Sequence, residues 1–187
     1  KTSHQKSNHT FRVGPMIIDY AGMYKYLGVF FHEHCDFTEN VDILAKSAGR
    51  ALGSIVAKLK KNNFMSYSTY TKLYDSCVVP IVDYASEVWG FKNYNKPNTL
   101  QNRAMRIFLG VHRFAPVAGL EGDMSLLSPQ YRRWLNMLRF WNRLISMDFN
   151  RTTRNTFEYA YTMFLNGCAN WCCDIFAVFE YLGLELY

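Results

Sequence analysis

A five-residue stretch near the start of the chain, Tyr24-Lys25-Tyr26-Leu27-Gly28, divides the sequence into two parts with different hydrophobic patterns. Before it, short apolar runs separated by Gly14-Pro15 and Ala21-Gly22 are typical of strands and turns. After residue 36, apolar residues recur every three or four positions almost to the end, as in amphipathic helices. The pattern therefore predicts a mostly α fold, a helical bundle preceded by a small antiparallel β element.

Three strands are expected in the β element. Two are short, Phe11–Val13 and Met16–Ile18, and the third is a continuous run from Tyr24 to Phe31. Because side chains alternate along an extended segment, Tyr24, Tyr26 and Gly28 are expected on one face of the third strand. From these residues alone, an ordinary buried strand ending in a bulge is the favoured interpretation.

The first expected helix covers residues 36–61. Asp36 is its predicted N-cap, with Glu39 in capping-box spacing, and Asp42 is expected to pair with Lys46 one turn later. The apolar positions form one face, and basic residues form the opposite face. This basic face comprises Lys46, Arg50, Lys60 and Lys61.

Two further helices are expected before residue 111. The first begins at Ser66 or Ser68 and is kinked or broken by Pro80, which lacks the backbone N–H of a helix interior. Residues 93–98 are expected to form a turn, and a helix after them ends at Gly110. Residues 111–127 are rich in glycine and proline and are predicted to be irregular.

Ser128-Pro129 is a strong helix start, and the helix is expected to run to about residue 147. Its predicted core stripe comprises Trp134, Leu138, Trp141 and Ile145. Arg132, Arg139 and Arg143 fall together on the opposite side. Planar guanidinium groups on an exposed stripe suit phosphate, although a merely solvated face has the same pattern. Two shorter helices, residues 153–165 and 169–182, complete the bundle.

Composition restricts the compartment and the partners. All 21 Lys and Arg residues lie before residue 155, and the charged residues of 155–187 are all acidic. The net positive charge of residues 1–154 suits a polyanionic partner. No apolar run is long enough to span a membrane. Five cysteines without a Cys-x-x-Cys pair predict reduced thiols and an intracellular protein, with nucleus and cytoplasm not distinguished.

No recognisable active site is present. Nucleotide-binding glycine loops, zinc-hydrolase helices and nucleophile elbows are all missing. His32-Glu33-His34 is a weak metal motif, and Cys168, Cys172 and Cys173 are better explained as helix residues than as zinc ligands. Paired carboxylates for two-metal phosphoryl transfer are also lacking. The chain is therefore expected to be non-catalytic on its own and to need no cofactor.

The order of several motifs resembles the C-terminal part of reverse transcriptases from non-LTR (LINE-type) retrotransposons. The motifs are Lys1-Thr2, Tyr24-Lys25-Tyr26-Leu27-Gly28, Tyr74-x-x-Cys77-x-x-Pro80-Ile81-x-x-Tyr84-x-x-x-x-Trp89-Gly90, Gln101-Asn102-Arg103-Ala104, Leu138-Arg139-Phe140-Trp141, Asn170-Trp171 and Gly183-Leu184. The resemblance implies that Tyr26, Leu27 and Gly28 form the primer grip. It also implies that Lys1 is the lysine of motif D and that the helices form the thumb.

The same resemblance implies a domain division, with residues 1–35 as the end of the palm and residues 36–187 as the thumb and following helices. The implied partners are template–primer nucleic acid, either RNA–DNA hybrid or duplex and bound without sequence preference, and the missing palm and fingers. In that family the catalytic aspartates, which hold Mg²⁺ in the parent polymerase, lie upstream of this region. Two alternatives stay open, an all-α protein-interaction module and a non-functional relic of a decayed element.

Overall fold

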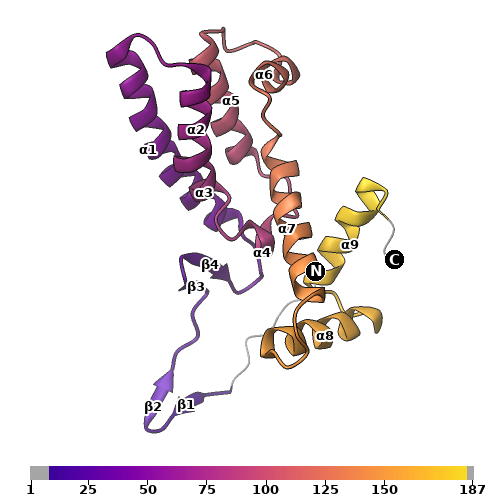
Figure 1. Ribbon diagram of the computed structural model, residues 1–187. Coiled ribbons are helices and arrows are strands. Elements are labelled where there is room, and N and C mark those ends of the chain that lie inside the picture. The colour runs from indigo at the N-terminus through magenta and orange to yellow at the C-terminus, as the bar shows by residue number, and fades with distance from the viewer. Residues whose placement is uncertain (1–8, 185–187) are drawn as a thin grey trace. The chain divides into compact units, whose positions relative to one another are not determined.

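The computed structural model describes residues 9–184 and confirms a mostly helical chain with a small antiparallel β element at its start. The chain divides into two compact units, the first ending at Phe37 and the second beginning at Thr38 (Figure 1). The first unit contains two antiparallel hairpins. One pairs β1 (Phe11–Val13) with β2 (Met16–Ile18), and the other pairs β3 (Met23–Tyr26) with β4 (Val29–His32).

The predicted continuous strand from Tyr24 to Phe31 is wrong, because the chain reverses at Leu27 and Gly28. These two residues have positive φ angles of 46° and 88°, as a tight two-residue hairpin loop requires, and Tyr26 pairs with Val29 across it. The buried-strand interpretation is also wrong. Of the eight residues, only Val29 is buried. Glycine readily adopts a positive φ, so Gly28 makes a turn possible where β-rich residues suggested a strand.

The second unit begins with α1 (Thr38–Asn62), which starts two residues after the predicted cap at Asp36. Next comes α2 (Tyr67–Cys77), whose predicted cap Ser66 accepts a hydrogen bond from the Thr69 N–H at 3.2 Å. The expected break at Pro80 is confirmed. Helix α2 ends at Cys77, and the short helices α3 (Val79–Val82) and α4 (Ser86–Trp89) follow.

Two segments expected to be irregular are helical. Helix α5 (Asn95–Leu109) begins inside the predicted turn, and Pro97 is tolerated because the first turn of a helix needs no intrahelical N–H donors. Helix α6 (Val117–Met124) lies inside the predicted loop. It forms despite its glycines because Leu120 and Met124, one turn apart, are both buried.

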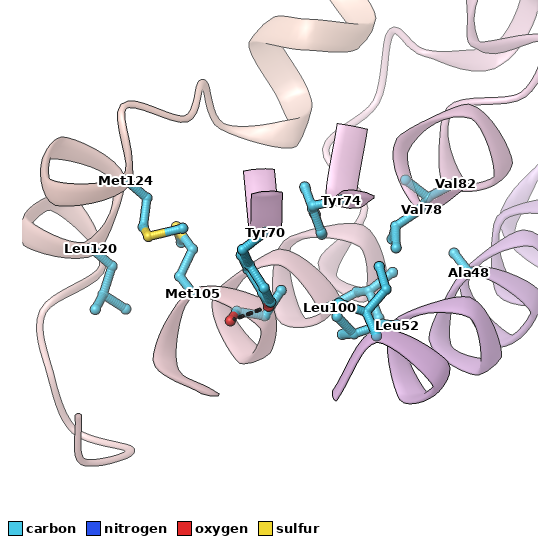
Figure 2. Packing of buried hydrophobic residues seen from close by; sticks show 12 residues of the cluster. Ala48, Leu52, Tyr70, Tyr74, Val78, Val82, Leu100, Met105, Leu120 and Met124 are labelled. Carbon is cyan, nitrogen blue, oxygen red and sulfur yellow. Dashed lines mark hydrogen bonds between the residues drawn. The ribbon is translucent and has the colours of Figure 1, made fainter. Parts of the chain in front are cut away.

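The first core lies among α1, α2, α3, α5 and α6 (Figure 2). Tyr70 is buried within it, stacks on Phe108 at 4.5 Å between ring centroids, and donates a hydrogen bond to the Ala104 carbonyl at 2.8 Å. The buried members are Ala48, Leu52, Ile55, Tyr70, Tyr74, Val78, Val82, Leu100, Ala104, Met105, Leu120 and Met124.

Burial raises the pKa of Tyr70 from 10.0 to about 12. The folded state therefore keeps this proton where the unfolded chain loses it, so Tyr70 makes stability fall between about pH 10 and 12. We expect Tyr70→Phe to cost about 1 kcal/mol at pH 7 through the lost hydrogen bond. The difference in free energy of unfolding between wild type and Tyr70→Phe should become smaller as pH rises from about 10 to 12. Urea unfolding of both proteins from pH 8 to 11.5 measures it, and a gap independent of pH would contradict the assignment.

The second core lies among α7 (Pro129–Ile145), α8 (Thr152–Leu165) and α9 (Trp171–Leu182). Helix α7 starts at Pro129 as predicted, although the Ser128 side chain makes no capping hydrogen bond. Trp134 and Trp141 are buried as expected. Ile145 was predicted to face the core but is 47% exposed, whereas Met137 and Leu144 of the same helix are buried.

Candidate nucleic-acid interface

The residues that the resemblance assigns to a primer grip form the tip of the second hairpin. Leu27 is 74% exposed and Tyr26 is 57% exposed, so both side chains are available to a partner. Behind the tip, the Lys25 ammonium lies 5.4 Å from the Phe30 ring centroid, within cation–π range. Lys1, the candidate motif D lysine, lies outside the described residues.

The basic face expected on α1 is exposed to solvent, with Lys46, Arg50, Lys60 and Lys61 all at the surface. The predicted pair between Asp42 and Lys46 is wrong, because the Asp42 carboxylate instead forms an ion pair with Lys96 at the start of α5. A helix neighbour in the bundle therefore takes the carboxylate that sequence spacing assigned to Lys46. The ammonium of Lys46 is left on the exposed face without that neutralising partner.

Two of the three arginines expected on α7 lie at the surface as predicted. Arg139 and Arg143 are exposed and line a shallow pocket of about 390 Å³ together with Glu87, Asn136 and Phe140. The Arg143 guanidinium lies 4.9 Å from the centroid of the Phe140 ring, which holds it above an aromatic face. Stacking of this kind restricts a guanidinium while leaving its N–H groups free to reach an anion.

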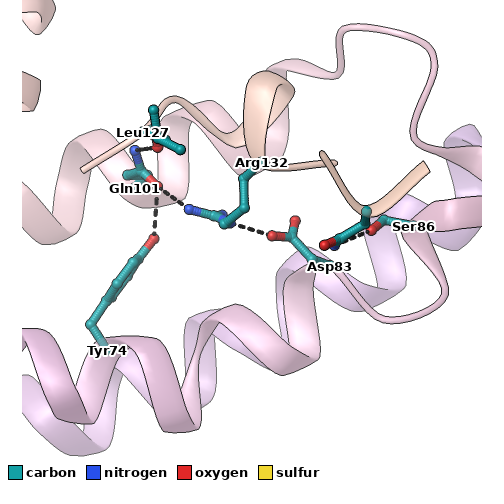
Figure 3. A network of polar contacts seen from close by, with 7 residues as sticks. Tyr74, Asp83, Ser86, Gln101, Leu127 and Arg132 are labelled. Atoms are coloured by element: carbon teal, nitrogen blue, oxygen red, sulfur yellow. Dashed lines mark hydrogen bonds and ion pairs between the residues drawn. The ribbon is translucent and has the colours of Figure 1, made fainter. Parts of the chain in front are cut away.

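Arg132, the third member of the predicted stripe, is not on that exposed surface. Its Nε donates to the Asp83 carboxylate, and its Nη1 donates to Gln101 Oε1 at 2.8 Å. Gln101 in turn donates from Nε2 to the Leu127 carbonyl at 2.9 Å, so the side chains form a connected polar network (Figure 3). The prediction of three arginines on one solvent-facing stripe is therefore wrong at Arg132, which joins α7 to α5 and to the α3–α4 connection.

Arg133 is a buried basic residue that periodicity did not single out. Its side chain is fully buried, and within residues 9–184 none of its three nitrogens has a hydrogen-bond partner. Its guanidinium lies 5.7 Å from the centroid of the Trp89 ring and 5.9 Å from that of Tyr94. Burial lowers the pKa of Arg133 from 12.5 to about 10, while the nearby Asp83 acts to raise it. The sequence pointed to a buried arginine only through the consecutive pair Arg132-Arg133 on a strongly amphipathic helix.

The weak metal motifs do not assemble into a site in the part of the chain that the structure describes. No group of three or more His, Cys, Asp or Glu side chains is placed to hold a metal ion there. The His32 Nδ1 accepts a hydrogen bond from the His34 backbone N–H at 3.2 Å. All five cysteines are free thiols, and burial raises the pKa of Cys172. Across residues 9–184, no helix has the length and apolar character needed to cross a membrane.

Comparison with curated proteins finds one informative similarity. The chain is 25% identical over 132 residues, or 69% of its length, to a probable RNA-directed DNA polymerase from transposon BS of Drosophila melanogaster. The matched region is 15% of that protein, so this chain corresponds to a small part of it. No protein-family model and no solved structure matches. The similarity supports a relationship between this chain and transposon reverse transcriptases.

Proposed function

We propose that this chain is the part of a non-LTR retrotransposon reverse transcriptase that comprises the end of the palm, with the primer grip, and the thumb. In this proposal the hairpin tip at Tyr26, Leu27 and Gly28 is the primer grip, and the helical unit is the thumb. The thumb binds template–primer nucleic acid through its backbone phosphates, without sequence preference. The chain has no polymerase activity of its own, because it lacks the carboxylates that would hold the two catalytic metal ions.

The observation that carries the proposal is the distant similarity to a transposon RNA-directed DNA polymerase. Two features of the helical unit support its nucleic-acid part, the exposed basic face of α1 and the exposed pair Arg139 and Arg143 on α7. Phosphate contacts made by such side chains give affinity without reading the base sequence.

The proposal predicts salt-dependent binding of an RNA–DNA hybrid by the whole chain. Fluorescence anisotropy with a labelled hybrid should give a Kd that rises by about tenfold or more between 50 and 200 mM salt. Binding of the protein releases cations condensed on the nucleic acid, and this release is less favourable at higher salt. A variant with Lys46, Arg50, Arg139 and Arg143 changed to alanine should bind more weakly and lose about 0.9 from the log–log salt slope for each phosphate contact removed. Arg132 is left unchanged because it holds the buried network.

A control variant removes positive charges away from these faces, at the exposed residues Lys72 on α2 and Arg151 before α8. It should bind nearly as wild type. A Kd that does not change with salt would contradict the proposal. So would an equal loss of affinity for each positive charge removed in the two variants. Two hybrids of unrelated sequence should bind alike.

A second candidate function is suggested by the first unit, which exposes most of its large apolar side chains. These are Phe11, Val13, Met16, Ile17, Ile18, Tyr20, Met23, Tyr24, Tyr26, Leu27 and Phe31. Apolar surface on short, open-edged hairpins is suited to another protein surface. A protein-interaction module would be favoured over the thumb if the folded chain formed a tight oligomer by analytical ultracentrifugation and bound no hybrid.

A further inference from the structure

One pocket in the helical unit is lined by none of the basic residues of α1 and α7 described above. It has a volume of about 630 Å³ and is formed by the C-terminal part of α5 and the segment that follows it. Its lining includes three arginines, Arg103, Arg106 and Arg113, with two small polar side chains, Thr99 and Asn102. Ile107 and Val111 supply its apolar part. None of these arginines belongs to the faces of α1 or α7.

Local backbone geometry brings the three arginines together. Arg103 and Arg106 are three residues apart on α5, so they are neighbours on one side of the helix. Gly110 ends the helix with a left-handed φ of 65°, and the Val111 N–H returns to the Arg106 carbonyl at 3.2 Å. This reversal turns the following segment back, so that Arg113 lines the same pocket as the two helix residues.

Arg106 also fixes the pocket wall. Its Nη2 donates to the Ala115 carbonyl at 3.0 Å, which ties the segment after the helix to α5. Its Nε is buried and has no hydrogen-bond partner within the described residues. Arg103 lies at the surface, and Arg113 lies 4.7 Å from the ring centroid of Phe114. Thus one arginine is structural, and the two exposed ones are available to a ligand.

The pocket is strongly electropositive because its lining holds three guanidinium groups and no carboxylate. Within residues 9–184, the carboxylates that form ion pairs with arginine do so elsewhere, Asp83 with Arg132 and Glu158 with Arg154. A forked guanidinium recognises the oxygens of a phosphate with paired N–H donors. The pocket volume is in the range of ligand sites rather than of a single bound ion, and its apolar side suits a sugar or base.

We propose that this arginine pocket, formed by Arg103, Arg106 and Arg113, binds consecutive backbone phosphates of a nucleic-acid strand. The inference rests on the proposed function and adds a contact site that neither basic face provides. Helices α1 and α5 end on the same side of the helical unit (Figure 1). The last turn of α1 carries Lys60 and Lys61, while Arg106 lies in the last turn of α5 and Arg113 follows that helix.

The test uses the whole chain, the same labelled RNA–DNA hybrid, and anisotropy at several salt concentrations. The variant Arg103→Ala/Arg113→Ala removes the two exposed arginines and keeps Arg106, which holds the wall. Loss of two phosphate contacts should lower the log–log salt slope by about 2 and weaken binding about tenfold or more at 50 mM salt. The charge-matched control Lys72→Ala/Arg151→Ala should change the slope by much less.

A near-isosteric variant, Asn102→Asp, tests the pocket without removing any packing atoms. A carboxylate placed among the arginines should repel phosphate and weaken binding at least threefold, whereas Asn155→Asp on the exposed face of α8 should have little effect. Circular dichroism verifies that each variant keeps its helices. If Arg103→Ala/Arg113→Ala loses helicity, the comparison of Asn102→Asp with its control Asn155→Asp tests by itself whether the pocket binds phosphate.

The outcomes separate this inference from the function on which it rests. If wild type binds the hybrid and the pocket variants match their controls, the pocket inference is overturned and the thumb proposal stands. If the folded wild type binds no hybrid, both are overturned. A polyglutamate peptide that displaces the hybrid at equal concentration, and loses this ability with Arg103→Ala/Arg113→Ala, would overturn the nucleic-acid assignment in favour of an acidic protein partner.

Discussion

Replacing Asp83 with asparagine is expected to lower the free energy of unfolding of the helical unit by about 3–5 kcal/mol. Asp83 is buried, pairs with Arg132, and is the carboxylate whose charge favours the protonated form of the buried Arg133. Removing its charge leaves the partly buried Arg132 and the fully buried Arg133 without this counter-charge. Urea unfolding followed by tryptophan fluorescence measures the loss, since all four tryptophans lie in this unit.

Two comparisons separate the charge effect from general damage. Asp75→Asn changes an exposed aspartate on α2 and should cost less than about 0.5 kcal/mol. Arg133→Met removes the buried guanidinium that lacks hydrogen bonds, so it should be neutral or stabilising, and it should recover part of the loss when combined with Asp83→Asn. A cost below 1 kcal/mol for Asp83→Asn would show that the interior tolerates both arginines without this carboxylate.

Trp141→Ala is expected to have a comparably large effect, about 3–5 kcal/mol. The Trp141 ring is buried at the centre of the second core. Its centroid lies 5.1 Å from that of Phe157 and 5.7 Å from those of Phe176 and Phe179, with nearly perpendicular ring planes. Truncation would remove aromatic contacts from α8 and α9 at once and leave a cavity. The same urea titration applies, with the remaining tryptophans as probes.

Ile145→Ala on the same helix is the matched control. Sequence periodicity placed Ile145 beside Trp141 in the core, but the side chain is 47% exposed, so we expect a loss below about 1 kcal/mol. If Ile145→Ala destabilised the chain as much as Trp141→Ala, the position of the core on α7 would need revision.

The starts of α2 and α7 and the break near Pro80 were predictable because they depend on local chemistry. Ser66 caps α2, Pro80 interrupts the helix that precedes it, and Pro129 begins α7, each through a property of the residue itself. Helix α6 was missed for the opposite reason. Its glycines are unfavourable locally, but burial of Leu120 and Met124 in the first core outweighs that cost.

The candidate site was only partly predictable, because spacing along one helix does not specify what faces that helix. Lys46, Arg50, Arg139 and Arg143 are exposed as periodicity predicted. Arg132 has the same period, but it pairs with Asp83, which is 49 residues earlier in the chain, and its side chain is only 18% exposed. The arginine pocket was missed because Arg113 reaches it from a loop, where no periodic rule applies.

Helix α7 contacts both cores of the helical unit. Its aromatic residues pack against α8 and α9, and its Arg132 side chain bonds to α5 and to the α3–α4 connection. One continuous helix therefore links the first core to the second. Because a helix is stiff over the length of α7, about 20 Å from Arg132 to its end at 1.5 Å per residue, the orientation of α8 and α9 relative to the first core depends on how α7 is held, by the polar bonds of Arg132 and by its packing on α4.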